Sequence, residues 1–148
     1  MNRREMLRNV GIAAVSTVAV STFTTSALGQ HEHHHAGGTY AALISASAEC
    51  NGAAGACVAH CQELLSQGDK SLTNCLKTST QVEIICGSLR SLAVHNADLT
   101  PQMAALALQA CKACEAECRK HEKIHAVCKA CADACAACAA ECEKVKAA

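Results

Sequence analysis

Beyond Tyr40 the apolar and polar residues of the chain recur with the period of an α-helix. Apolar or small residues return at intervals of three and four, and no stretch shows the two-residue period of a strand. The pattern predicts four helices, at about residues 41–67, 70–95, 101–119 and 124–146. Because short connections join them, neighbouring helices should run antiparallel. The sequence therefore predicts an all-α protein, an antiparallel up-down-up-down four-helix bundle that occupies residues 41–148.

Residues that favour helix ends lie where the periodic pattern stops. Gly68 follows the first helix, and glycine commonly ends a helix because it adopts positive φ without strain. Asp69 or Ser71 is expected to cap the second helix with a side-chain oxygen. Thr100 is expected to cap the third, because Pro101 would then occupy the first helical position. The connections between the helices are therefore expected to be short.

Cysteine occupies much of the inward stripe of all four predicted helices. In the fourth helix the cysteines are separated by 3, 4, 3 and 4 residues, a spacing that normally places Leu or Ile against a bundle core. The thirteen cysteines are Cys50, Cys57, Cys61, Cys75, Cys86, Cys111, Cys114, Cys118, Cys128, Cys131, Cys135, Cys138 and Cys142. We therefore expect a cysteine-lined core, completed by apolar residues such as Leu43, Val82 and Leu89.

The first 29 residues form a separate unit with the features of an export signal peptide. Arg3 and Arg4 precede an apolar run, residues 10–23, that is too short and too rich in Ser and Thr to span a membrane. The paired arginines resemble the twin-arginine signal, and the small residues up to Gly29 suit cleavage before Gln30. We therefore expect an exported, periplasmic protein, with no membrane span in the mature chain.

The charge balance of the mature chain excludes several classes of function. Without residues 1–29 the chain carries ten basic and twelve acidic residues, a net charge of about −2 before histidine is counted. That balance argues against nucleic-acid binding, and the composition gives no catalytic lead, so we expect no enzyme. Residues 30–40 are a His-rich segment with four histidines in five residues. It could capture copper, nickel or zinc, or it could be a solvated tail.

A stripe of buried thiols is compatible with more than one chemistry. A disulfide framework suits an exported protein, but the odd number of cysteines and their positions along continuous helices disfavour it. Isolated four-thiolate zinc sites would each bury two negative charges more than the ion supplies. Thiolate selects Cu(I), and one Cu(I) per thiolate keeps the core neutral. Residues at i and i+3 or i+4 also lie close enough for two sulfurs to hold one ion. Copper is favoured, while zinc or another thiophilic metal, and a thiol redox buffer or sensor, stay open.

The cysteine spacing resembles that of the bacterial copper storage proteins, and in particular their exported, twin-arginine-dependent members. The match extends across the mature chain, from Cys50-x6-Cys57-x3-Cys61 to the five cysteines of the fourth helix. This resemblance implies that the thiols line the bundle lumen and bind many Cu(I) ions, about one per cysteine. It also implies that the bundles associate as homotetramers, and that they hold copper for copper enzymes and limit free copper.

The resemblance further implies a metal-receiving end of the bundle that carries histidine and methionine. His60, next to Cys61 near the end of the first helix, fits the histidine. The methionines do not carry over, because that region holds Leu64, Gln67 and Leu72. His121 and His125, in the turn before the fourth helix, lie at the same predicted end and could substitute, or they could be exposed loop residues. His95 lies at the opposite end and is given no role.

Overall fold

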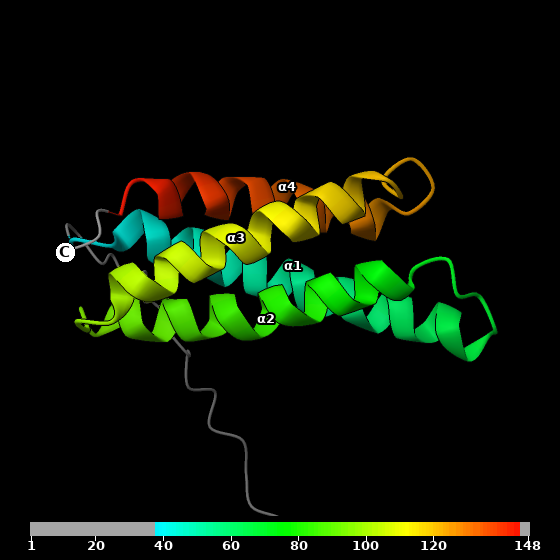
Figure 1. Cartoon of the computed structure of the whole chain (residues 1–148), viewed down its shortest axis with the longest axis horizontal. Coiled ribbons are helices and arrows are strands. Elements are labelled where there is room, and N and C mark those ends of the chain that lie inside the picture. Colours follow the sequence, from blue (N-terminus) through cyan, green and yellow to red (C-terminus); the bar gives the residue numbers. More distant parts are fainter. Residues whose placement is uncertain (1–37, 146–148) are drawn as a thin grey trace, which may run out of the picture. The chain divides into compact units, whose positions relative to one another are not determined.

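The structure, a computed structural model, describes residues 38–145, which form the predicted four-helix bundle (Figure 1). The helices are α1 (Ala41–Ser66), α2 (Thr73–Val94), α3 (Thr100–Arg119) and α4 (Ala126–Glu143). Helix α1 packs against α2 and α4, and α3 packs against the same two helices. Successive helices run in opposite directions, which confirms the antiparallel arrangement (Figure 1). The predicted signal peptide and most of the His-rich segment lie outside the described residues.

Two residues with positive φ end helices at the predicted places. Gly68 has φ +88° after α1, and its N–H donates to the Leu65 carbonyl at 3.0 Å. Asn96 has φ 48° after α2, and its N–H donates to the Ala93 carbonyl at 3.1 Å. Glycine adopts this backbone conformation without strain, and asparagine tolerates it better than most residues. The first two connections are therefore tight turns, as the sequence predicts.

The predicted side-chain caps of α2 and α3 are wrong. Asp69 Oδ1 accepts a hydrogen bond from the Ser71 N–H at 2.8 Å within the loop, and Leu72 is the residue that precedes α2. Helix α3 begins at Thr100, one residue earlier than expected, so Thr100 lies inside the helix and its hydroxyl donates to the Ala97 carbonyl at 2.7 Å. These polar side chains satisfy the turns that lead into the helices instead of the first helical N–H groups. Helix α4 is also shorter than predicted, beginning at Ala126 and ending at Glu143.

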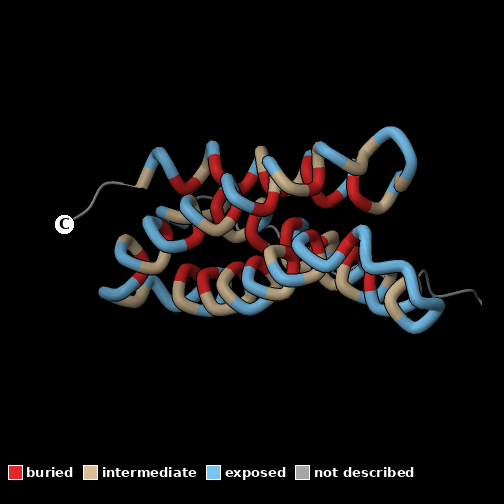
Figure 2. The backbone as a smooth tube through the Cα atoms, turned by 45° about the vertical axis from the view of Figure 1, so that its right-hand side comes forward, coloured by how far each residue is buried: buried red, intermediate tan, exposed pale blue. Residues whose placement is uncertain are grey.

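The bundle core has two parts along its axis. Near the beginning of α1 the buried residues of the first three helices are apolar or small; we call this set the apolar plug, and it consists of Leu43, Ser47, Leu89, Ala93, Thr100, Ala104 and Ala107. From the plug to the other end, most of the buried residues are cysteines. Buried positions face the interior along all four helices (Figure 2). The thiols therefore form a column that the plug closes at one end.

None of the helices within residues 38–145 combines the length and apolarity that crossing a membrane requires. The buried serine hydroxyls of the core donate to carbonyl groups of their own helices. Ser47 Oγ donates to the Ile44 carbonyl at 3.1 Å, and Ser79 Oγ donates to the Cys75 carbonyl at 2.7 Å. Thiol sulfur is therefore the main group in the core that is free to bind a ligand.

Candidate metal centre

All thirteen cysteines are free thiols, and all are buried in the bundle core. Nine hydrogen bonds join pairs of thiols, with S···S distances of 3.3 to 3.9 Å. Eight of these pairs join cysteines of different helices; the exception is Cys114 and Cys118 on α3, 3.8 Å apart. The expected pairing of same-helix neighbours therefore describes a minor part of the network. Small residues let the helices approach closely, so a thiol on one helix meets thiols on the next.

Four groups of cysteines have sulfur atoms close enough together to share a metal ion, all within 4.8 Å of one another inside each group. One group contains a cysteine from each helix, Cys50, Cys86, Cys111 and Cys138. The other three contain three cysteines each: Cys57, Cys61 and Cys75; Cys57, Cys118 and Cys131; and Cys114, Cys131 and Cys135. Cys57 and Cys131 are shared among the three smaller groups, and the Cys50–Cys135 contact of 3.8 Å joins the four-member group to them. The arrangement is therefore one continuous set of thiols and not a row of isolated sites.

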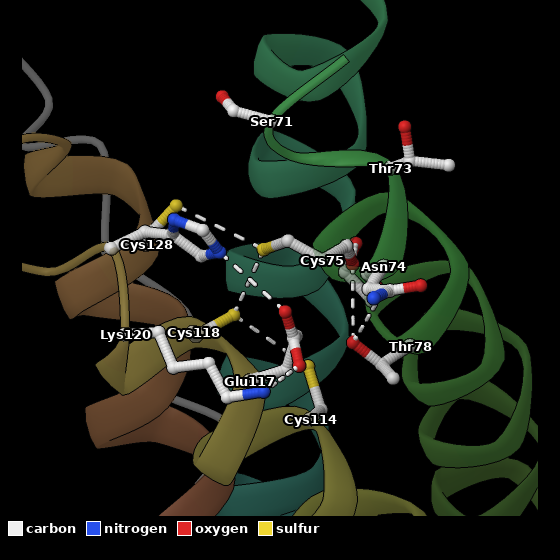
Figure 3. A network of polar contacts seen from close by, with 12 residues as sticks. Ser71, Thr73, Asn74, Cys75, Thr78, Cys114, Glu117, Cys118, Lys120 and Cys128 are labelled. Atoms are coloured by element: carbon white, nitrogen blue, oxygen red, sulfur yellow. Dashed lines mark hydrogen bonds and ion pairs between the residues drawn. The ribbon is translucent and has the colours of Figure 1, made fainter.

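Helix α2 contributes thiols at only two levels of the column. Cys75 hydrogen-bonds to Cys118 at 3.3 Å and to Cys128 at 3.9 Å (Figure 3). It also hydrogen-bonds to Cys57 at 3.5 Å, and so links all four helices. Cys86 lies three turns further along α2, and the buried residues between the two are Ser79 and Val82. The middle of the column is therefore lined by thiols of α1, α3 and α4, which explains why its groups have three members.

Hydrogen bonds between thiols favour ionisation at four positions. The pKa of Cys111 is lowered to about 5, chiefly by a hydrogen bond from Cys135. The pKa values of Cys57 and Cys114 are lowered chiefly by hydrogen bonds from Cys118. Cys138 also has a lowered pKa, chiefly through its hydrogen bond with Cys111. Each of the four groups contains at least one of these residues. Every group therefore offers a thiolate that can bind the first ion.

The other nine cysteines hold their protons more strongly than a free thiol. Burial raises the pKa of Cys61 to about 12 and that of Cys128 to about 11. Cys118 has a raised pKa mainly because its proton is shared with Cys114. A metal ion must displace these protons, since the thiolate is the ligand form. Filling the column therefore releases protons, and the metal competes with hydrogen ions for most of the sulfur atoms.

The end of the column opposite the plug carries a pair of histidines. We call this end the mouth; there α1 ends, α2 begins and a turn joins α3 to α4. His60 Nε2 lies 3.1 Å from His125 Nδ1, and both rings are half-buried. Their ring centroids are 5.0 Å apart, with an angle of 60° between the planes. Two imidazole nitrogens at this distance can act as ligands of one ion, because copper and zinc accept imidazole readily.

A third histidine lies beside the mouth with a carboxylate partner. His121 Nε2 is 3.5 Å from Glu117 Oε1, beyond a good hydrogen bond, and this buried nitrogen has no other partner. Glu117 also pairs with Lys120 (Figure 3). Lys120 lowers the pKa of Glu117, so the carboxylate stays ionised. Sequence reasoning missed Glu117, although its spacing of four from His121 on a helix was a usable signal.

The histidine predictions agree with the positions of these residues. His60 and His125 come together, His121 lies in the same turn as His125, and His95 is exposed at the end of α2 that carries the plug. Leu72, which stands where the resemblance would place a methionine, has a structural role of its own. It is one of the largest fully buried side chains and packs in the core next to the mouth. The mouth therefore combines the half-buried imidazoles of His60 and His125 with the buried apolar side chain of Leu72.

The fold and the site together define a metal-binding four-helix bundle whose interior is built from thiols. The family model described as copper storage protein matches residues 36–147. The chain belongs to the copper storage protein family, and copper bound by core cysteines is its cargo. The family is one of storage proteins and not of enzymes, which agrees with the sequence prediction.

Two solved structures support the family assignment. The Cu(I)-bound copper storage protein BsCsp3 has 29% sequence identity to this chain, with a TM-score of 0.65, over 73% of this chain and 98% of that one. Apo copper storage protein 3 from Bacillus subtilis has 30% identity and a TM-score of 0.64, over 73% of this chain and 99% of that one. A comparison with curated proteins gave no significant match.

Proposed function

We propose that the protein stores Cu(I) at a capacity of about one ion for each of its thirteen cysteines. The observation that supports this capacity most directly is the continuity of the thiol network. The nine S–H···S contacts and the four groups together connect twelve of the thirteen cysteines into one network, and Cys142 lies one helical turn beyond Cys138 on α4. One monovalent ion per thiolate leaves the filled core neutral, which a chain of low net charge can accommodate without buried cations.

Loading would begin at the mouth and proceed toward the apolar plug. The plug excludes an ion at the other end, because its buried side chains offer no sulfur ligand on α1, α2 or α3. At the mouth, His60 and His125 would receive an ion and pass it to Cys61, Cys75 or Cys128. Thiolates of lowered pKa, such as Cys57 and Cys114, would then hold the first ions, and further ions would displace protons from the remaining thiols.

Export and association are further parts of the proposal. Arg3, Arg4 and the apolar run that follows support export by the twin-arginine route, in which the folded bundle would protect its thiols before they meet an oxidising compartment. Replacement of both arginines by lysine should leave the precursor in the cytoplasm, as cell fractionation would report. Periplasmic copper enzymes would then be the recipients of the stored ions.

Homotetramer formation is supported by apolar side chains on the outer surface of the bundle. Ile84 on α2 is 64% exposed and Leu106 on α3 is 47% exposed. Leu106 and Ile85 line a groove between the two helices, together with uncharged neighbours such as Gln81 and Ala110. Such a surface suits contact with another copy of the chain. Light scattering of the wild type and of Ile84→Lys should give a tetramer and a smaller species, respectively.

Metal analysis of loaded protein tests the storage function. Reduced apo-protein is mixed anaerobically with excess Cu(I), unbound copper is removed by gel filtration, and copper and protein are measured. Storage predicts nearly as much copper as thiol. A thiol count on the freshly isolated apo-protein separates storage from a redox buffer, because storage requires nearly all thirteen cysteines to be reduced. Substantial disulfide content with little copper uptake would favour the redox function instead.

A further inference from the structure

Among the four groups of cysteines, only one has four members, and its geometry differs in kind from the others. Cys50, Cys86, Cys111 and Cys138 come one from each helix and lie just beyond the apolar plug. Cu(I) is stably coordinated by two or three thiolates, and every group supplies at least three cysteines. Four sulfurs around one point are the arrangement that a tetrahedral divalent ion requires.

The distances within this group match a tetrahedral zinc site. With Zn–S bonds of about 2.3 Å, the sulfurs of a regular tetrahedron lie about 3.8 Å apart. Cys50 and Cys111 are 3.8 Å apart, Cys86 and Cys111 are 3.7 Å apart, and Cys86 and Cys138 are 3.9 Å apart. The remaining pairs are within 4.8 Å. Zn²⁺ would therefore need only small side-chain adjustments to bind.

Each ligand is held by a different helix, and each is fully buried. The group thus has no route to water except along the column, so a bound ion would exchange slowly. Four thiolates with one Zn²⁺ leave an excess of two negative charges. Neighbouring thiols would reduce this cost by donating S–H hydrogen bonds to the thiolates. In the metal-free structure the Cys50 S–H donates to Cys135 at 3.8 Å; once Cys50 is a metal-bound thiolate, Cys135 would become the donor of this contact.

We propose that Cys50, Cys86, Cys111 and Cys138 form a tetrahedral Zn(II) site that binds one ion per chain when copper is scarce. The bound Zn²⁺ would tie the four helices together next to the plug while the rest of the column is empty. Excess Cu(I) would displace it, because thiolate prefers the softer ion and each departing Zn²⁺ frees four ligands. This inference uses thiols of the proposed copper store but does not depend on the store's capacity.

Zinc competition tests the site in reduced apo-protein under anaerobic conditions. Zn²⁺ is added in the presence of a chromophoric zinc chelator, and the wild type should withhold one equivalent per chain from it. Cys111→Ser and Cys50→Ser should each lose this equivalent. Cys128→Ser is the matched control: it removes a buried thiol that belongs to none of the four groups, and it should retain the zinc. Co(II) in place of zinc should give the visible spectrum of a tetrahedral tetrathiolate site, absent in Cys111→Ser.

Circular dichroism establishes whether each variant is folded. If Cys111→Ser does not fold, Cys50→Ser keeps the test valid. The proposal is overturned if the wild type withholds no zinc, if Cys111→Ser and Cys50→Ser retain it, or if Cys128→Ser loses it equally. Cu(I) capacity is measured on the same samples. A normal copper capacity without a tight zinc equivalent would refute the zinc site alone, whereas failure of copper uptake would refute the storage function.

Discussion

The His60 Nε2 atom lies 3.1 Å from His125 Nδ1, although 65 positions separate the two residues in the chain. The contact joins the end of α1 to the start of α4 directly above the thiols of the mouth. Because the thiols are buried and both imidazoles are partly exposed, the proposed loading route has an ion from solvent meet imidazole before thiolate.

Replacement of His60 or His125 by alanine should slow the uptake of Cu(I) by about tenfold while leaving the final capacity nearly unchanged. The physical reason is that the imidazoles receive the ion but the thiols hold it. Stopped-flow mixing with a coloured Cu(I) complex measures the rate. His95→Ala, at the plug end, is the matched control and should load at the wild-type rate. Equal rates in all three variants would mean that ions do not pass the histidine pair.

Cys75→Ser should impair loading more than Cys142→Ser does. Cys75 contacts thiols on the other three helices near the mouth, whereas Cys142 lies at the far end of α4. Each change removes one ligand, so each should lower the capacity by about one ion. Only Cys75→Ser should also slow the filling of the remaining column. If Cys142→Ser loads as slowly as Cys75→Ser, the proposed direction of filling is wrong.

The stability of the apo-protein should fall as the pH rises above about 8.5, the pKa of a thiol in an unfolded chain. Burial raises the pKa of Cys61 to about 12 and that of Cys128 to about 11 in the folded state. Below about pH 8.5 both states keep these protons, so the full stabilisation is present. Above that pH the unfolded chain loses protons that the native state retains. Each such thiol then lowers the free energy of unfolding by about 1.4 kcal/mol per pH unit until its folded pKa is reached.

Urea unfolding of reduced apo-protein at several alkaline pH values measures this loss. The copper-loaded protein is the control, because its thiols have already lost their protons and its stability should depend much less on pH. An apo-protein whose stability stays constant from about pH 8 to about pH 10.5 would show that the buried thiols are not held in the protonated form.

Much of the fold was predictable because helical periodicity, short connections and small core residues all point to the same bundle. The 3 and 4 spacing of cysteines on α3 and α4 correctly placed those thiols in the core. Gly68 correctly predicted the end of α1, because glycine adopts positive φ without strain and this preference depends only on the residue itself. The caps failed because Asp69 and Thr100 have alternative partners within their own turns, and local sequence does not decide between them.

The detailed site was less predictable, because it depends on the levels at which the helices pack. Spacing along one helix suggested same-helix pairs, yet the contacts of Cys75 and Cys86 are with other helices. The single four-thiol group arises because Cys86 of α2 lies close to one thiol from each of the other three helices. One turn away on α2 the buried residue is Val82, which has no thiol. Likewise, the sequence placed His60 and His125 at the same end but gave no sign that their rings would touch.

Anaerobic titration of reduced apo-protein with Cu(I), in competition with a chromophoric Cu(I) chelator, tests the central proposal most directly. The chelator should stay free of copper until nearly thirteen ions per chain have been bound, and then saturate sharply. Saturation after only one to about three ions would contradict storage, because a column with that capacity would leave most of its thiols without a ligand role.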